Sequence, residues 1–199
     1  MINAPKRPDF DRATVLQILE SAFYRAAEQD YAKGYIINEE DVRASVYRYV
    51  RNSLDLVPLW RVFTNLSSFS SPDTEQGFFK PDLVFFHSPG DEYSPRVEIF
   101  AEIKHWPDQP KIEADLAKLD KLRKIYQPES PDVAFFAIVG TDIPADDALK
   151  LTLALKSKHP DAHIWLKPHV QPDGSAIYDG PWDLASGLDP WRKRLRHLS

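Results

Sequence analysis

The segment PDVAFFAIVG, residues 131–140, limits the fold more than any other part of the sequence because its apolar run is almost unbroken. A strand of this kind is apolar on both faces, so other elements must cover both of them. Amphipathic helical patterns precede it at 111–126 and follow it at 144–159. We therefore expect an α/β protein in which helices flank a mixed central sheet.

The remaining elements follow from the same periodicities. Helical spacing of apolar residues predicts helices at 9–34 and 38–54, and Asn38 is the natural N-cap of the second. Strand patterns cover 57–66, 80–88, 96–104 and 162–168. Asp173-Gly174 favours a hairpin turn, and short helical pieces are expected near the C-terminus.

The length of 199 residues predicts a single domain, because few chains of this size divide in two. Its core would cover about residues 38–140. The helix at 9–34 would be added before that core, and a C-terminal extension over 141–199 would supply a helix, strands and a basic tail.

The composition excludes several classes of protein. The chain has no cysteine, which excludes disulfides, thiolate zinc sites and cysteine nucleophiles. A formal net charge of -5 excludes a generally basic surface, so any nucleic-acid contact requires a local basic patch. We find no glycine-rich phosphate loop, nucleophile elbow, signal peptide or membrane-length apolar run. We therefore expect a soluble, cytoplasmic protein without a membrane partner, whose oligomeric state the sequence does not indicate.

A predicted hairpin concentrates charged residues near one end of two strands. Alternation in VEIFAEIKHWP, residues 97–107, predicts two faces, one with Val97, Ile99, Ala101 and Ile103, the other with Glu98, Phe100, Glu102 and Lys104. If the turn is centred on Glu92, the numbers of paired residues sum to about 184. Asp82 then lies opposite Glu102, with Cβ atoms about 5 Å apart.

This pairing predicts a metal site. Two carboxylates so close repel each other, and a divalent cation between them removes that cost. Oxygen ligands suit Mg²⁺ or Mn²⁺ better than zinc. Lys104 would stand beside the metal without binding it, where it would align or activate a water or stabilise charge on a phosphoryl oxygen. Together these residues fit metal-assisted hydrolysis of a phosphodiester.

Pro81-Asp82 followed some twenty residues later by Glu102-Ile103-Lys104 resembles the motif of the PD-(D/E)XK nuclease superfamily. The resemblance covers roughly residues 38–140 and implies a restriction-endonuclease-like core of helix, three strands, helix and strand. It also implies that Asp82 and Glu102 hold the metal and that Lys104 assists the water. A glutamate from the preceding helix often completes such a site. Glu39 fits best because it faces inward, and Glu40 is the alternative.

The resemblance also implies contributions from the helix that follows the motif, where Asp115 and Lys118 are candidates. The basic residues near the C-terminus are candidates for phosphate contacts or, alternatively, form a solvated basic helix end; they are Arg192, Lys193 and Arg194. Trp106 has two interpretations as well, stacking on a base or packing at an exposed edge. Glu39 itself could instead be a first-turn acid that complements the helix dipole.

Three functions remain open on sequence grounds. The first is a metal-dependent nuclease that acts on nucleic acid, with DNA favoured over RNA and a protein partner possible for targeting. The second is a non-catalytic module of the same fold, for binding or scaffolding in a larger nucleic-acid-processing or defence assembly. The third is an unrelated α/β protein in which Asp82 and Glu102 are surface carboxylates and Lys104 is their salt-bridge partner.

Overall fold

The computed structural model describes residues 10–31, 35–54, 59–64, 80–88, 95–126, 131–139 and 145–168. The predicted hairpin at 173–174, the C-terminal helical pieces and the basic tail lie outside these ranges. The elements in chain order are α1 (Arg12–Arg25), η1 (Ala26–Asp30), α2 (Glu39–Leu54), β1 (Trp60–Thr64), β2 (Leu83–His87), β3 (Arg96–His105), α3 (Gln109–Ile125), β4 (Asp132–Val139), α4 (Ala145–Lys158) and β5 (Ala162–Pro168).

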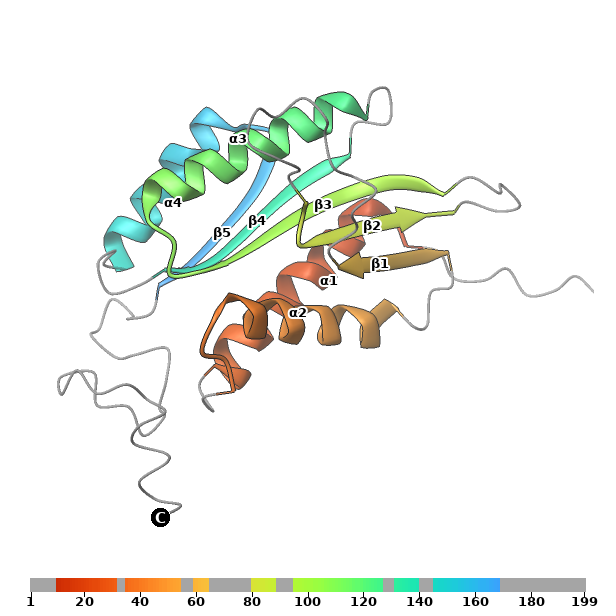
Figure 1. Cartoon of the computed structure of the whole chain (residues 1–199), viewed down its shortest axis with the longest axis horizontal. Coiled ribbons are helices and arrows are strands. Elements are labelled where there is room, and N and C mark those ends of the chain that lie inside the picture. Colours follow the sequence, from red (N-terminus) through yellow and green to blue (C-terminus); the bar gives the residue numbers. More distant parts are fainter. Residues whose placement is uncertain are drawn as a thin grey trace, which may run out of the picture.

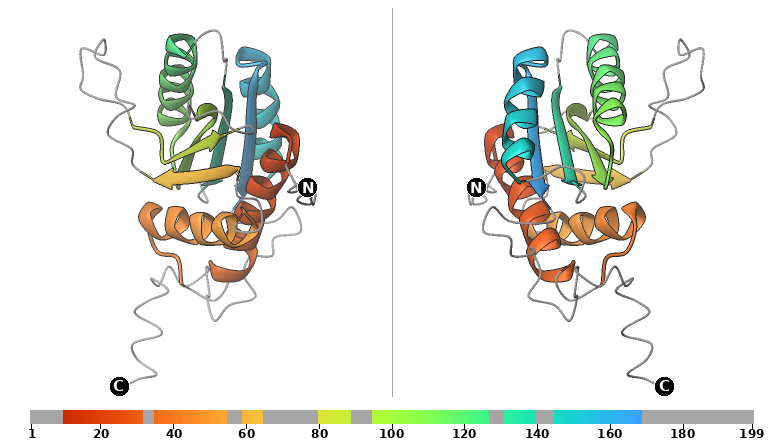
Figure 2. Two further views of the ribbon diagram at one scale, coloured as in Figure 1. Left: turned by 90° about the vertical axis from the view of Figure 1, so that its right-hand side faces the viewer. Right: turned by 90° about the vertical axis from the view of Figure 1, so that its left-hand side faces the viewer.

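The five strands form one mixed sheet in the order β1-β2-β3-β4-β5. Strands β1, β2 and β3 pair antiparallel, whereas β3, β4 and β5 pair parallel. Figures 1 and 2 show α1 and α2 on one side of the sheet and α3 and α4 on the other. The predicted α/β architecture with a helix-flanked mixed sheet is therefore confirmed. None of the described helices has the length and apolar character that crossing a membrane requires.

Strand β4 explains why the sheet needs two helical layers. Its side chains alternate between two hydrophobic clusters, one with α1 and α2 and the other with α3 and α4. Phe136 belongs to the first cluster and Phe135 to the second, and both are fully buried. The unbroken apolar run in the sequence is thus a strand covered on both faces, as predicted.

A β-bulge alters the faces predicted for the start of β3. Phe85 pairs with Ile99 but Phe86 pairs with Val97, so Glu98 is an extra residue on β3. Val97 consequently lies in the cluster of α3 and α4, and Glu98 accepts a hydrogen bond from Arg12 Nε of α1 at 2.8 Å. The prediction that Val97 shares a face with Ile99, and Glu98 with Phe100, was wrong for this reason.

The N-terminal half differs from the prediction in one further respect. The helix expected over 9–34 is an α-helix only as far as Arg25, and η1 continues it as one π-helical turn. Helix α2 begins as predicted, since Asn38 Oδ1 accepts the backbone N–H of Asp41 at 3.0 Å. This cap fixes the start of the first turn of α2, which carries Glu39.

Candidate metal centre

The register of the β2–β3 hairpin brings Asp82 and Glu102 together. Leu83 pairs with Ala101 and Val84 with Phe100, which is the predicted pairing, so Asp82 stands level with Glu102. The two residues are only 4% and 3% exposed. The predicted pair of neighbouring carboxylates is therefore present, and it is buried.

Asp82 is held by one hydrogen bond and one ion pair. Its Oδ2 accepts the backbone N–H of Ile103 at 2.8 Å, and its Oδ1 lies 2.9 Å from Nη1 of Arg43 in α2. Arg43 also pairs with Glu40, the alternative acid of α2, whose side chain is 71% exposed. In the sequence, only the i,i+3 spacing from Glu40 distinguishes Arg43.

Glu102 has a different environment from Asp82. Its Oε1 lies 2.6 Å from Lys104 Nζ, whereas its Oε2 is buried and has no hydrogen-bond partner among the described residues. Buried polar atoms in native proteins are almost always paired, and an unpaired one calls for an unseen water or ion. The carboxylate of Glu102 therefore has the capacity to bind one more group.

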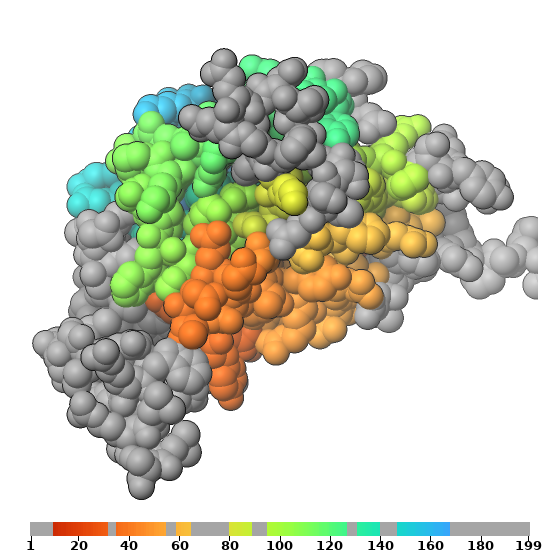
Figure 3. Space-filling view, in the orientation of Figure 1, coloured from red at the N-terminus to blue at the C-terminus, as the bar shows by residue number. Residues whose placement is uncertain are grey.

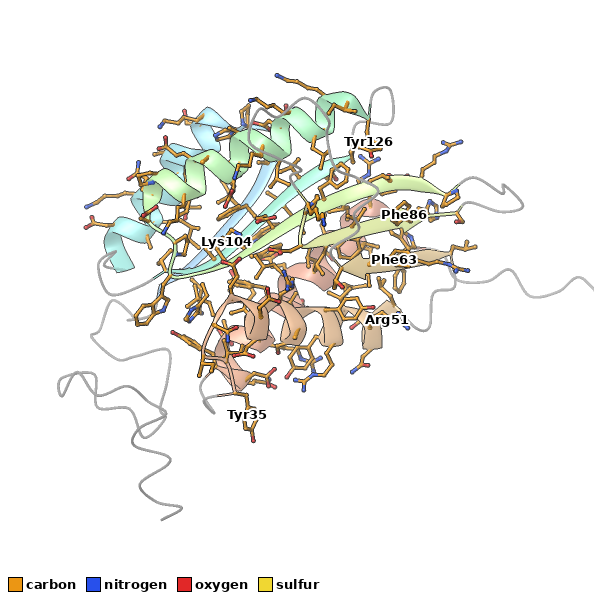
Figure 4. All side chains as sticks on the ribbon, viewed as in Figure 1. Tyr35, Arg51, Phe63, Phe86, Lys104 and Tyr126 are labelled. Atoms are coloured by element: carbon orange, nitrogen blue, oxygen red, sulfur yellow. The ribbon has the colours of Figure 1, made fainter. Side chains whose placement is uncertain are left out.

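The Lys104 ammonium lies close to acidic side chains from three elements, β3, α2 and α3. Besides Glu102, its Nζ lies 3.0 Å from Oε1 of Glu39 in α2 and 3.7 Å from Oδ2 of Asp115 in α3. Figure 4 shows Lys104 at the end of β3 between the two helical layers. In Figure 3, orange atoms of α2 adjoin green atoms of β3 and α3 at the surface. Asp82 and Glu102 are themselves buried.

The charges of the site shift one another's pKa values. Burial raises the pKa of Glu102 to about 8, and repulsion from Asp82 adds to the rise. Burial also raises the pKa of Asp82, against the hydrogen bond from Ile103 and the charges of Arg43 and Lys104. Burial disfavours the Lys104 ammonium, but attraction by Glu102 and Asp82 outweighs that effect and raises the pKa of Lys104. The Lys104 ammonium therefore stays charged, whereas the carboxyl of Glu102 ionises only at a higher pH than usual.

The donor set fits a hard divalent cation. Asp82 and Glu102 offer only carboxylate oxygens, and Glu102 Oε2 is unsatisfied. Among the described residues, no group of three or more histidines and acids is arranged to hold a metal. The carboxylate of Glu39 accepts a hydrogen bond from the Lys104 ammonium. A role for Glu39 as third ligand thus stays a prediction.

Of the other predicted site residues, the structure describes Asp115 and Lys118 but not the basic tail. Asp115 is 9% exposed and its Oδ1 accepts a hydrogen bond from Lys118 Nζ at 2.8 Å, so both lie at the edge of the site. The basic residues of the tail lie outside the described residues; they are Arg192, Lys193 and Arg194.

Comparison with known proteins assigns no family to the chain. No family model matches it, and no curated protein or solved structure matches it either. The fold and the site define a class: an α/β protein with two buried carboxylates beside a lysine.

Proposed function

We propose that this protein is a Mg²⁺- or Mn²⁺-dependent nuclease that hydrolyses phosphodiester bonds, with DNA favoured over RNA. The observation that carries the proposal is Glu102 Oε2, a buried carboxylate oxygen without a partner beside a second buried carboxylate, Asp82. The acids of a surface salt-bridge cluster are accessible to water, whereas Asp82 and Glu102 are only 4% and 3% exposed.

The element order supports the proposal. The chain from α2 to β4 runs helix, three strands, helix and strand. This is the order that the resemblance to PD-(D/E)XK nucleases implies, with Asp82 before β2 and Glu102 and Lys104 in β3. Because folds host many functions, the residues weigh more than the order of elements.

Asp82 and Glu102 would hold the cation, with Glu39 as the proposed third ligand. When bound, Mg²⁺ or Mn²⁺ supplies the positive charge that neutralises the phosphodiester and the two carboxylates. Burial, and next the repulsion from Asp82, raises the pKa of Glu102. The charge of a bound cation would offset both effects, so that the carboxyl could ionise at neutral pH.

The environment of Lys104 defines its role in the reaction. Although burial disfavours the ammonium, attraction by Glu102 and Asp82 raises the pKa of Lys104 and so favours its charged form in the metal-free protein. We infer that Lys104 acts as a positive charge and hydrogen-bond donor, which orients water and stabilises charge that develops on a phosphoryl oxygen. Glu39 and Asp115 hold the ammonium in place from two helices.

A second function, a non-catalytic binding module, is favoured by one specific observation. Arg43 already neutralises Asp82, and Lys104 already contacts Glu102, so cationic side chains occupy one oxygen of each acid. In a protein of this kind both pairs would persist in the presence of metal, and no hydrolysis would follow.

Cleavage of single-stranded DNA and of RNA with Mn²⁺, compared with EDTA, separates the two functions. We expect cleavage only with Mn²⁺. Lys104→Met should bind the metal at least as tightly as the wild type, because no ammonium then competes for Glu102, while turnover falls about 100- to 1,000-fold. Lys121→Ala is the matched control, because Lys121 is exposed on α3 and should not affect turnover. Metal binding without cleavage of either substrate would favour the binding module.

A further inference from the structure

Trp106 is a large exposed aromatic residue two positions after Lys104. Its side chain is 48% exposed, although it follows a strand whose preceding apolar residues are buried. Its φ angle is 52°, in the left-handed region, which a residue with a Cβ atom rarely adopts. Such conformations persist only where the surroundings enforce them, and they concentrate at functional sites.

Contacts with Ile138, Tyr31 and His105, among the described residues, hold Trp106 in this conformation. Its backbone N–H donates to the carbonyl of Ile138 in β4 at 2.7 Å. Its indole N–H donates to the hydroxyl of Tyr31, which directly follows η1, at 2.9 Å. The indole also stacks on His105, with ring centroids 5.5 Å apart and an angle of 20°. The ring is thus fixed in orientation before any ligand arrives.

The chemistry of the exposed surface follows from these contacts. Since Tyr31 already accepts the indole N–H, what the side chain offers to solvent is aromatic carbon surface and not a hydrogen-bond donor. A ligand that suits this surface is planar and stacks. Trp106 lies two residues from Lys104, so their Cα atoms are at most about 7 Å apart. A base next to a phosphodiester at Lys104 would be within reach of the indole.

We propose that Trp106 is a stacking platform for an unpaired base of the substrate, next to the phosphodiester that is cut. This inference rests on the proposed function for the identity of its ligand. Bases inside a duplex already stack on their neighbours, so a base can meet an indole only when it is unpaired or turned out. The substrate class is therefore single-stranded nucleic acid or a duplex with an unpaired end. With a net charge of -5, the protein gains little general attraction to phosphates, so stacking carries a large share of the affinity.

The test is binding of fluorescently labelled single-stranded oligothymidylate, followed by anisotropy in EDTA, where no hydrolysis occurs. Trp106→Ala should weaken binding about 5- to 150-fold, the range for loss of one stacked base, and Trp106→Phe should weaken it less. Phe63→Ala is the control: Phe63 is 40% exposed on β1, distant from Lys104 in Figure 4, and its loss should not change the affinity.

A sugar–phosphate strand of equal length without bases distinguishes stacking from a structural role. Wild type and Trp106→Ala should bind this strand equally. Equal weakening on both strands, or equal dependence on Trp106 for a blunt duplex, would overturn the inference.

The assay also separates this inference from the proposed function. Lys104→Met, without turnover, should still show base-dependent binding. An active nuclease in which Trp106→Ala has normal affinity and normal KM would overturn the stacking role alone. Base-dependent binding without cleavage in Mn²⁺ would overturn the nuclease alone.

Discussion

Replacing Glu102 with glutamine tests the electrostatics of the site without metal. Glutamine has nearly the shape of the protonated carboxyl but cannot ionise. In the metal-free protein the pKa of Glu102 is raised to about 8 from 4.5, chiefly by burial and next by Asp82. Between these values the unfolded chain has released the proton and the folded chain still holds it. Stability must therefore fall as the pH rises from about 5 to about 8.

The size of the effect follows from the shift. Each pH unit in this window costs up to about 1.4 kcal/mol. Because the window from pH 5 to pH 8 covers most of the shift from 4.5 to about 8, we expect the wild type to lose about 2–4 kcal/mol of stability across it. The pKa of Asp82 is also raised and adds to the slope, whereas the raised pKa of Lys104 acts only at higher pH. The other charged residues at this site are the same in wild type and variant; they are Asp115, Glu39 and Arg43.

The assay is urea unfolding in EDTA at pH 5 and at pH 8. Glu102→Gln should match the wild type at pH 5, exceed it at pH 8, and show a smaller slope between them. Glu28→Gln, on the exposed side of η1, serves as the control and should follow the wild-type slope. Parallel profiles for wild type and Glu102→Gln, or a less stable variant at pH 8, would refute the reasoning.

Two further predictions concern residues on α2. Arg43→Met should lower metal-free stability by about 3 kcal/mol, because it leaves Asp82 buried without its cation, and should raise Mn²⁺ affinity in calorimetry because no guanidinium competes; unchanged affinity would mean that Arg43 and the metal do not share Asp82. Glu39→Gln should change stability by less than about 1 kcal/mol, since its side chain is 40% exposed and its repulsion from the other acids is offset by Lys104. Its Mn²⁺ affinity should fall, and normal binding would remove Glu39 from the ligand set.

The parts of the fold that local patterns determine were predictable. The apolar run of β4 required helices on both faces, and the hairpin register followed from alternation about a central turn. That register alone placed Asp82 beside Glu102. The bulge at Glu98 was not predictable, because one extra residue in a strand leaves the apolar composition of the segment unchanged.

The polar contacts of the site could be identified only from the tertiary structure. Arg43 reaches Asp82 across 39 positions of sequence, and no periodicity links the two. Glu39 was expected to face the sheet, and it does approach the site, but its carboxylate meets Lys104. The fixed geometry of Trp106 could not be predicted either, since it depends on Tyr31, directly after η1, and on Ile138 in β4.

The most direct test of the account is calorimetric titration of Mn²⁺ into the wild type and into Asp82→Asn at pH 7.5. Asp147→Asn serves as the control, because Asp147 is exposed on α4 and pairs with Lys150. If Asp82 and Glu102 share one cation, the wild type and the control bind Mn²⁺ and Asp82→Asn does not. Undiminished binding by Asp82→Asn, or no binding by the wild type, would contradict the account.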